Sequence, residues 1–330
     1  MGESRQGFGR ARRMIVRFVA LALVAPAFAW AQAWPAKPVR LIAASSPGSA
    51  VDIVSRLVAQ KLSDQLGVQV VVDNRAGAGG NLGAELAAKA PPDGYTLFMG
   101  TPAQAINTGL YRKLDYDLLR DFTPVSLLTN GHFSLTVHPS LPAQSVKDLI
   151  ALARRRPGEL NYASAGNGNA THLAGALFNS LANVELVHVP YKGTGPALTD
   201  VLGGQVQIMF PNLTAAMPYV KAKRLRALAV TGERRSAIVP ELPTIAESGL
   251  KGYRVISWFG LMTPAGVSPD IVGRLQKEIV VVMRLPDVRE KLAAEGAEPM
   301  ASTPEQFATF MKAEITQWVK IVREAKVSAE

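Results

Sequence analysis

The sequence predicts an α/β fold of two lobes, each a doubly wound sheet with helices on both faces. Short apolar runs alternate with segments of helical periodicity along most of the chain, which is the pattern of such sheets. The 330 residues, 48% of them hydrophobic, supply more core than one small domain needs. Two longer apolar segments, 123–131 and 253–266, interrupt the alternation and indicate crossings between the lobes.

Eight apolar runs are the predicted strands. Because helical segments separate several of them, we expect parallel sheets. The runs are VRLIAA (39–44), VQVVVD (68–73), YTLFMG (95–100), FSLTVH (133–138), LNYAS (160–164), ELVHV (185–189), VQIMF (206–210) and LRALAV (225–230).

The predicted helices are marked by periodicity and by signals at their starts. One stripe of helical spacing consists of Ile53, Leu57, Val58, Leu62 and Leu66. Two capping boxes are predicted, Ser49-x-x-Asp52 and Ser145-x-x-Asp148, and Pro stands in the first turn after Thr194, Ser268 and Thr303. The last third of the chain is mostly helical, over about 269–284, 286–295 and 304–325.

The two crossing segments determine the predicted domain limits. If both cross, the first domain is discontinuous and consists of residues 34–128 and 255–330, and the second domain consists of residues 129–254. Two α/β lobes joined in this way form a hinged clamp around a cleft.

Residues 1–33 have the pattern of a secretory signal peptide. Five arginines precede or enter the apolar run MIVRFVALALVAPAFAWAQA, and Ala29, Ala31 and Ala33 offer A-x-A cleavage sites. A membrane anchor is the alternative, but the apolar run after Arg17 is too short to span a bilayer comfortably.

The route of export and the start of the chain follow from the same segment. The Arg12–Arg13 pair lacks the rest of a twin-arginine pattern, which favours the general secretory route into the periplasm. Met14 is a second candidate start, because residues 14–33 form a complete short signal by themselves.

The charge of the exported part is modest. Residues 1–31 carry five arginines and one glutamate, a net charge of +4, which leaves +6 of the chain's +10 on the rest. The basic residues are scattered and not interleaved with aromatics, so we expect no nucleic-acid partner, whereas a weak positive field favours small anions. The chain has no cysteine, which excludes disulfides and thiolate chemistry and is compatible with a bacterial periplasm.

Three loops rich in Gly, Ser and Asn each follow a predicted strand and open a predicted helix: 44–52, 74–85 and 163–172. The second, NRAGAGGNLGAE, fails as a dinucleotide fingerprint because Leu82 stands where the third glycine belongs. Loops of this kind present free N–H groups at a helix N-terminus and suit a carboxylate or a phosphate. A plain turn is the alternative for one loop, but three at strand carboxyl ends indicate a ligand site.

Three single residues have two interpretations each. Asp52 is a ligand partner or the cap partner of Ser49, His172 is a donor to a ligand carboxylate or a packing residue, and Lys192 is a site cation or solvated. We expect structural roles for His132, His138 and His188, which lack metal-ligand spacing, and core or hinge packing for Trp258 and Phe259.

Catalysis has little support in the sequence. The chain contains neither H-E-x-x-H nor G-x-S-x-G, and the three loops hold no close pair of carboxylates. We therefore expect a binding protein without a cofactor or metal rather than an enzyme.

Seven segments together resemble the substrate-binding proteins of tripartite tricarboxylate transporters, the Bug family. They cover nearly the whole exported chain. They are WPAKPVRLI (34–42), PGSAVDIVSRLVAQKL (47–62), NRAGAGGNLGAELAAKAPPDGYTLFMGT (74–101), YASAGNGNATHLAGALF (162–178), HVPYKGTGPALTDVLGGQVQIMF (188–210), LRALAVTGERRS (225–236) and LPTIAESGLKGY (242–253).

This resemblance implies a two-lobed periplasmic binding protein fold of the type II-like Venus flytrap kind. It implies that a small carboxylate is captured in the cleft, mainly by backbone N–H groups, hydroxyls and water, by a monomer that delivers it to a membrane permease of two subunits. Two alternatives stay open: the same clamp signalling to a sensor kinase, and a periplasmic enzyme.

The resemblance also implies the ligand-binding residues. Carried over by motif, they are Pro47, Gly48, Ser49, Asp52, Gly80, Asn81, Thr101, Ser164, Gly166, Asn169, Thr171, His172, Tyr191, Lys192, Gly193, Asn212 and Thr214.

The sequence departs from the family pattern at two places. The first loop, usually F-x-P-G-G-x-x-D, has Ser45 in place of the aromatic residue and Ser49 in place of the second glycine. After VQIMF, where the family often has an acidic residue, Pro211 and Asn212 follow. A ligand ammonium group would lack its partner there, so we expect a di- or tricarboxylate or an aromatic acid.

Overall fold

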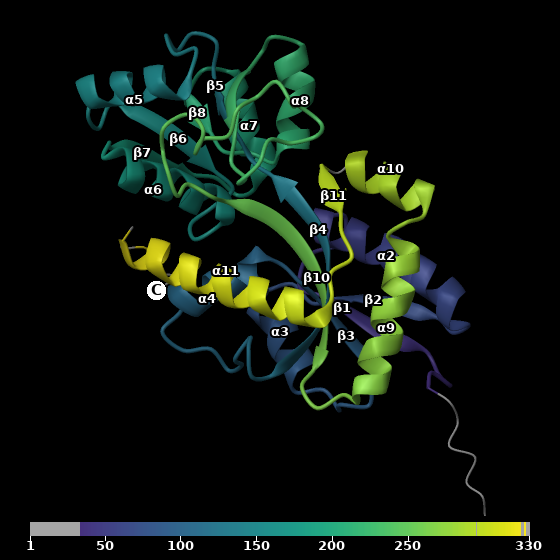
Figure 1. Cartoon of the computed structure of the whole chain (residues 1–330). Helices are drawn as coiled ribbons and strands as arrows, with labels where there is room; N and C mark the ends of the chain where they lie inside the picture. The colour runs from purple at the N-terminus through teal and green to yellow at the C-terminus, as the bar shows by residue number, and fades with distance from the viewer. Residues whose placement is uncertain (1–33, 295, 325–326, 328–330) are drawn as a thin grey trace, which may run out of the picture. The chain divides into compact units, whose positions relative to one another are not determined.

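The computed structural model describes residues 34–294, 296–324 and 327, without the side chain of Thr214; the predicted signal peptide lies outside the described residues. From Pro35 onward the chain forms one compact unit with two lobes, one built on a six-stranded sheet and the other on a five-stranded sheet (Figure 1). In the described part, no helix has the length and apolar character needed to cross a membrane.

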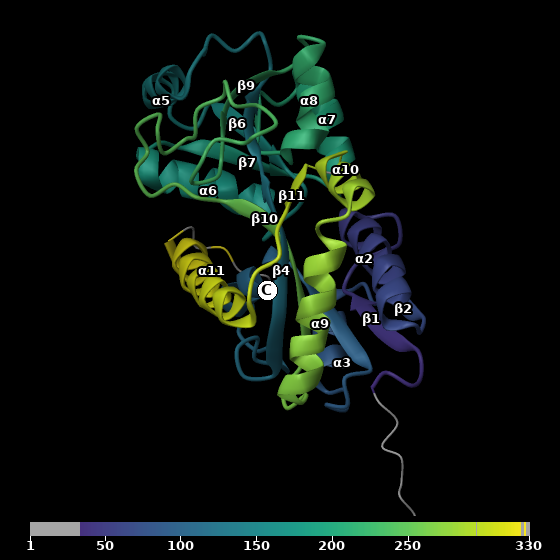
Figure 2. The ribbon, with the colours of Figure 1, turned by 45° about the vertical axis from the view of Figure 1, so that its right-hand side comes forward.

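The first lobe contains the six-stranded sheet, in the order β11-β4-β10-β3-β1-β2. Its α2 packs against α9 and its α4 against α11, so that helices cover both faces (Figure 2). Its elements are β1 (Val39–Ala43), α2 (Ala50–Leu66), β2 (Val70–Asn74), η1 (Ala78–Gly80), α3 (Asn81–Ala88), β3 (Thr96–Gly100), α4 (Pro102–Leu110), β4 (Phe122–His132), β10 (Ile256–Pro264), α9 (Pro269–Val282), α10 (Pro286–Ala294), β11 (Ala297–Pro299) and α11 (Pro304–Glu324).

The second lobe contains the five-stranded sheet, in the order β7-β6-β8-β5-β9. Its elements are β5 (Ser134–Val137), α5 (Val146–Arg155), β6 (Leu160–Ser164), α6 (Ala170–Ala182), β7 (Leu186–Pro190), α7 (Thr194–Leu202), β8 (Ile208–Met209), α8 (Leu213–Lys221) and β9 (Arg226–Val230). All eight predicted strands are therefore present, and the predicted helix starts at Ser49, Ser145 and Ser268 are capped by those side chains.

The expectation of parallel sheets is right for only part of each sheet. β1, β2 and β3 are parallel, as are β6, β7 and β8. It is wrong for β4, β10 and β11, and for β5 against β8 and β9, which are antiparallel. The reason is the crossing: β4 carries the chain out of the first lobe and β10 carries it back, so the two must run in opposite directions.

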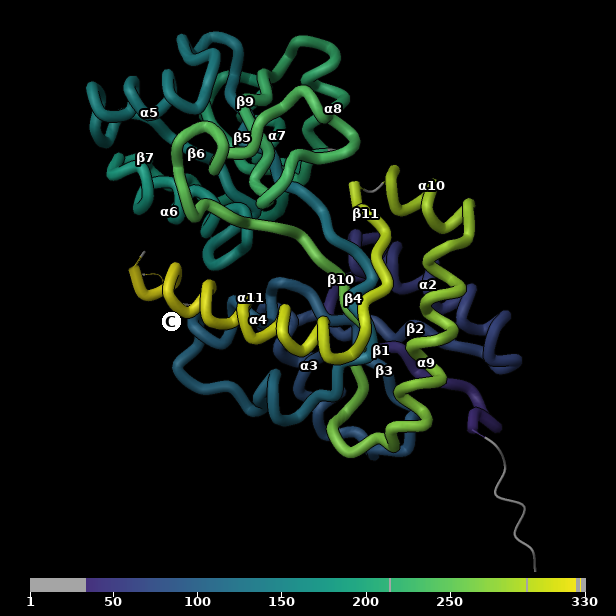
Figure 3. Tube along the Cα trace, viewed as in Figure 1, coloured from purple at the N-terminus to yellow at the C-terminus, as the bar shows by residue number. Residues whose placement is uncertain are grey.

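The two crossing strands pair with each other along their length and pass from one lobe toward the other side by side (Figure 3). At the end nearer the second lobe, the N–H of Phe133 donates to Oγ1 of Thr231 at 3.0 Å, and the N–H of Thr231 donates to the carbonyl of Phe133 at 3.1 Å. The N–H of Val255 donates to the carbonyl of Thr231 at 2.9 Å. Thr231, fully buried, therefore joins both crossing strands where they meet the second sheet.

A buried carboxylate on α11 fixes the return crossing to the first lobe. Glu314, 1% exposed, accepts hydrogen bonds from the indole N–H groups of Trp258 at 2.8 Å and Trp318 at 3.2 Å. Its other oxygen pairs with the guanidinium of Arg254 at 2.5 Å. Both indoles are fully buried, so each N–H needs this acceptor.

We predict that Glu314→Leu lowers the free energy of unfolding by about 3 kcal/mol, because it removes the buried carboxylate that pairs with Arg254 and leaves two indole N–H groups without an acceptor. Urea unfolding followed by tryptophan fluorescence measures the change. The control is Glu324→Leu on the same helix, where the carboxylate is 41% exposed and lies 3.8 Å from Nζ of Lys320 and 3.4 Å from Oγ of Ser180. Equal unfolding midpoints for the two variants would contradict the anchoring role of Glu314.

Candidate functional site

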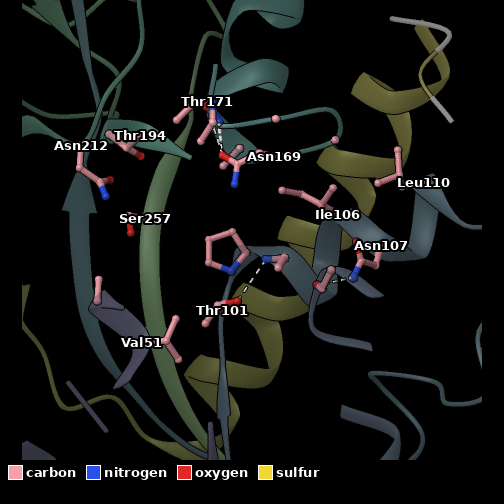
Figure 4. Close-up of a pocket in the computed structure, with 18 of the residues that line it drawn as sticks. Val51, Thr101, Ile106, Asn107, Leu110, Asn169, Thr171, Thr194, Asn212 and Ser257 are labelled. Carbon is pink, nitrogen blue, oxygen red and sulfur yellow. Dashed lines mark hydrogen bonds between the residues drawn. The ribbon is translucent and has the colours of Figure 1, made fainter. Parts of the chain in front are cut away.

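A cavity of about 540 Å³ lies between the lobes and has the size of a small-molecule site (Figure 4). Its lining includes the starts of five helices from both lobes, and the first turn of a helix carries N–H groups that have no partner within the helix. The residues at these starts are Ala50, Val51, Thr101, Pro102, Ala103, Asn169, Ala170, Thr171, Thr194 and Asn212.

The side chains of the cavity are neutral. Among the described residues that line it, none is Asp, Glu, Lys, Arg or His. Val51, Ile106, Leu110, Phe133 and Phe259 give it an apolar component. Elsewhere too, no three His, Asp or Glu side chains of the described part come together as a metal site. An anion in this cavity would therefore meet backbone N–H groups, hydroxyls and amides, and its carbon skeleton would meet apolar side chains.

The first loop is held by Asp52, which is 4% exposed and does not line the cavity. Its carboxylate accepts from the N–H of Gly48 at 2.9 Å and from the amide of Asn74 at 2.9 Å, and it pairs with Arg56 at 3.0 Å. The hydrogen bond from Arg56 holds the pKa of Asp52 below its usual value. One half of the predicted capping box is present, because Oγ of Ser49 accepts from the N–H of Asp52. The other half is not, because the carboxylate of Asp52 accepts from the N–H of Gly48 instead of that of Ser49.

The glycine loop 74–85 is fastened to α4 by amide side chains. Nδ2 of Asn107 donates to the carbonyl of Gly79 at 3.0 Å and to Oδ1 of Asn81 at 2.7 Å. The hydroxyl of Tyr116 donates to the same Oδ1 at 2.9 Å. Asn81 is the first residue inside α3 and does not cap it, because Gly80 is the N-cap. Asn107 lines the cavity and links the loop to it.

The start of α4 is organised in advance by a complete capping box. Oε1 of Gln104 accepts from the N–H of Thr101 at 2.9 Å, and Oγ1 of Thr101 accepts from the N–H of Ala103 at 3.3 Å. Gly80 leaves room for this arrangement: its φ is +91°, and a Cβ there would lie 2.8 Å from Nε2 of Gln104. Thr101 therefore meets the cavity in a fixed orientation.

The third loop, in the second lobe, approaches the first lobe closely. Gly168 has a φ of +70°, and a Cβ on it would lie 2.4 Å from a methyl carbon of Leu110 on α4. The positive φ and this close approach together favour glycine here. Oδ1 of Asn169 accepts from the N–H of Thr171 at 3.0 Å and caps α6, while its amide nitrogen points into the cavity (Figure 4). Asn169 is thus both a helix cap and a donor toward the site.

The segment after β7 is attached to this loop by its backbone. The N–H of Tyr191 donates to the carbonyl of Ser164 at 3.0 Å, and the N–H of Gly193 donates to the carbonyl of Ala165 at 3.1 Å. The side chain of Lys192 is exposed and does not line the cavity.

The structure divides the predicted site residues into two groups. Those that line the cavity are Thr101, Gly166, Asn169, Thr171 and Asn212. Those that lie behind or beside it are Pro47, Gly48, Ser49, Asp52, Gly80, Asn81, Ser164, His172, Tyr191, Lys192 and Gly193. Thr214 lies in α8, but its side chain is outside the described part.

Sequence reasoning missed most of the α4 wall and the crossing strand as site elements. Ile106 and Leu110 have helical spacing that is equally typical of core, and Ser257 and Phe259 lie in a segment interpreted only as a crossing or as packing. The signal that was present is Thr101-Pro102, a cap followed by Pro at the first helical position, directly after a buried strand.

Comparison with known proteins decides the family. The model of the tripartite tricarboxylate transporter family receptor matches residues 54–327. The chain belongs to this family. BugT of Bordetella pertussis is 37% identical to it over 296 residues, which are 89% of the chain and 91% of BugT.

Solved structures of similar proteins have the same two-lobed fold. The chain is 39% identical to Rpa4515 of R. palustris, solved with adipate, with a TM-score of 0.77 over 89% of the chain and 99% of that protein. It is 32% identical to MatC of Rhodopseudomonas palustris, solved with bound malate, with a TM-score of 0.74 over 88% of the chain and all of MatC. The predicted family and fold class are therefore confirmed.

We predict that Asp52→Ala weakens ligand binding through the first loop although Asp52 does not face the cavity. The variant removes the acceptor that fixes Gly48 and Asn74, and one such buried partner is worth about 1–3 kcal/mol. Calorimetric titration with an organic acid that the wild-type protein binds measures the loss of affinity. Asp64→Ala, on the exposed face of the same helix, is the control. If both variants bind as wild type does, the loop does not depend on Asp52.

Proposed function

We propose that the chain is a periplasmic solute-binding protein, a monomer, that captures a small organic carboxylate and delivers it to a two-subunit membrane permease. The observation that carries this proposal is the convergence of five helix N-termini on one cavity lined by neutral side chains. Helix N-termini favour anions through their free N–H groups and the helix dipole. Family membership and the adipate and malate complexes of similar proteins support the same ligand class.

Capture occurs by closure of the two lobes about the crossing strands. We assign residues 34–128 and 255–330 to one moving domain and residues 129–254 to the other. A ligand that touches both lobes favours the closed state by its additional contacts there. The side chains of α4 and of the third loop, which already approach through Leu110 and Gly168, form the facing walls.

The cavity favours a ligand without an ammonium group. Asn212, where an acidic residue is frequent in the family pattern, lines the cavity, and no described carboxylate does. An ammonium group would therefore lose its hydration without gaining an opposite charge. Di- and tricarboxylates and aromatic acids meet this requirement, and the apolar side chains of the lining accommodate their carbon skeletons.

A thermal-shift titration of the signal-free protein with adipate, malate and aromatic acids tests this function. The protein is first unfolded and refolded, so that a co-purified ligand is removed. A ligand present at 100 times its Kd stabilises the folded state by about 2.7 kcal/mol and raises Tm accordingly. A stripped, folded protein whose Tm responds to no organic acid would overturn the proposal.

Within the same assay, we predict that Asn169→Ala weakens binding of the best acid by about 1–3 kcal/mol, since the variant removes a donor to the ligand and the cap of α6. Asn161→Ala, on a strand of the same lobe outside the cavity lining, is the matched control. Unchanged affinity of the Asn169 variant would remove the third loop from the site.

The ligand class has its own test in a matched pair, succinate and aspartate, which differ by one ammonium group. We predict that succinate binds at least tenfold more tightly by calorimetry, and that Asn212→Asp narrows this ratio because it adds the missing opposite charge. Tighter binding of aspartate by the unaltered protein would show that the cavity accepts an ammonium group after all.

A further inference from the structure

Two imidazoles lie directly beneath the third loop and outside the cavity lining. His172, 7% exposed in the first turn of α6, and His188 on β7 stack face to face with ring centroids 3.7 Å apart and planes 8° apart. Such close, nearly parallel stacking suits two neutral rings, because two charged rings would repel each other strongly at this distance.

Each imidazole holds one part of the loop. The N–H of Gly168 donates to Nδ1 of His172 at 3.0 Å. Nε2 of His188 lies 2.6 Å from Oγ of Ser164, which in turn accepts from the N–H of Gly166 at 3.1 Å. Gly166 and Gly168 both line the cavity. The pair therefore connects directly to the backbone that faces the ligand.

The contact to Gly168 fixes the protonation state of His172. A backbone N–H can only donate, so Nδ1 must present its lone pair and the proton of the neutral ring must sit on Nε2. Protonation of His172 would place a second donor on Nδ1, facing the N–H of Gly168. The hydrogen bond would then become a repulsive contact between two donors, and the loop would have to move.

We propose that His172, stacked on His188, is a positioning residue that keeps the third loop in its ligand-binding conformation only while the ring of His172 is neutral. This inference rests on the proposed function, because it concerns the same cleft. His172 acts here as an acceptor for the loop and not as a donor to the ligand. Acidification then releases the loop, and with it the ligand, without any titratable side chain in the cavity itself.

The surroundings of the pair determine the pH range. Burial lowers the pKa of His172 to about 4, and burial together with the neighbouring His172 lowers the pKa of His188 to about 4. Tyr162 of β6 packs on both rings and stays neutral because burial raises its pKa. From α4 the side chain facing the loop is Leu110, and among the described residues no ion pair involves either ring.

The number of protons that each state of the loop binds determines the direction of the pH effect. A released loop has histidines of ordinary pKa, about 6.5, and so binds more protons than the held loop between pH 6.5 and 4. Falling pH in this window therefore favours release, by about tenfold per pH unit for the one proton that His172 takes up. Above pH 6.5 the held loop is unaffected.

The test uses the mature, ligand-free protein and NMR between pH 7 and 4. We expect the Gly168 amide resonance to titrate together with the imidazole of His172, at a midpoint well below 6.5. His172→Asn keeps an acceptor near the position of Nδ1 but cannot take up a proton, so its Gly168 amide should stay protected from exchange and should not titrate. His172→Phe keeps a flat ring without the acceptor, and its Gly168 amide should exchange freely at pH 7.

Binding of adipate, measured for each variant relative to wild type at the same pH, extends the test to the cleft. Ligand protonation cancels in this ratio. We expect His172→Phe to bind adipate about tenfold more weakly than wild type at pH 7. We expect His172→Asn to bind adipate better than His172→Phe does. On acidification, His172→Asn should lose less affinity than wild type loses. His138→Asn, which replaces a second-lobe histidine outside the cavity lining, is the control for the loss of an imidazole elsewhere in the lobe.

The outcomes separate the two proposals. A Gly168 amide that titrates identically in wild type and His172→Asn, or stays protected in His172→Phe, overturns the positioning role whatever binds in the cleft. If the amide behaves as expected while the stripped protein binds no organic acid, the positioning role stands and the proposed function fails. Should His172→Phe not fold, the comparison of wild type with His172→Asn still decides.

Discussion

The proposed site depends on one constraint: the backbone N–H groups at helix starts that no cap side chain takes up must be available to a ligand while the loops that carry them stay fixed. A buried polar group without a partner destabilises the fold by about 1–3 kcal/mol. The buried polar side chains that hold the loops must therefore be hydrogen-bonded themselves. Asp52, Asn107 and His172 resolve this conflict. Asp52 bonds to Gly48 before α2, His172 bonds to Gly168 before α6, and Asn107 bonds to Gly79, which itself lines the cavity. Rigidity and an available anion site thus come from different atoms of the same loop.

The same constraint explains how the two lobes are joined. In the proposed function, loops fixed within each lobe meet one ligand because the lobes move as whole bodies, with the motion confined to the crossing strands. Glu314 attaches β10 to the first lobe, and Thr231 attaches both crossing strands to the second. Between these two attachments the strands are bonded mainly to each other and within the first sheet. In the proposed closure, the angle between the lobes can therefore change at only a few residues of these strands.

Much of the fold could be predicted from the sequence because its signals are local. Apolar runs, capping serines and prolines at first turns marked the strands and helix starts. Strand direction could not be predicted, because β4 and β10 are antiparallel only as a consequence of the crossing. The strand β11 could not be predicted either, because its three residues are too few to have a pattern.

The sequence predicted which loops form the candidate site, but not which of their side chains line the cavity. The three Gly, Ser and Asn loops were evident, and Asn169 lines the cavity. Asp52, equally close to a helix start, turns its carboxylate to Gly48 instead. That difference lies in side-chain rotamers and in distant partners such as Asn74, which spacing along the chain does not encode. Ile106 and Phe259 line the site from elements whose apolar pattern is also that of core.

In the proposed function, the neutral walls of the cavity also determine how ligand binding and lobe closure are coupled. One helix N-terminus stabilises an anion by about 0.3–1 kcal/mol, rising to about 2 kcal/mol where water is partly excluded. An arginine on one lobe could hold a carboxylate in the open form by itself; a single helix start cannot. Here the helix starts are divided between the lobes, α2 and α4 in the first, α6, α7 and α8 in the second. In the proposed closure, their contributions add up only when the lobes close, so the ligand and the closed state stabilise each other.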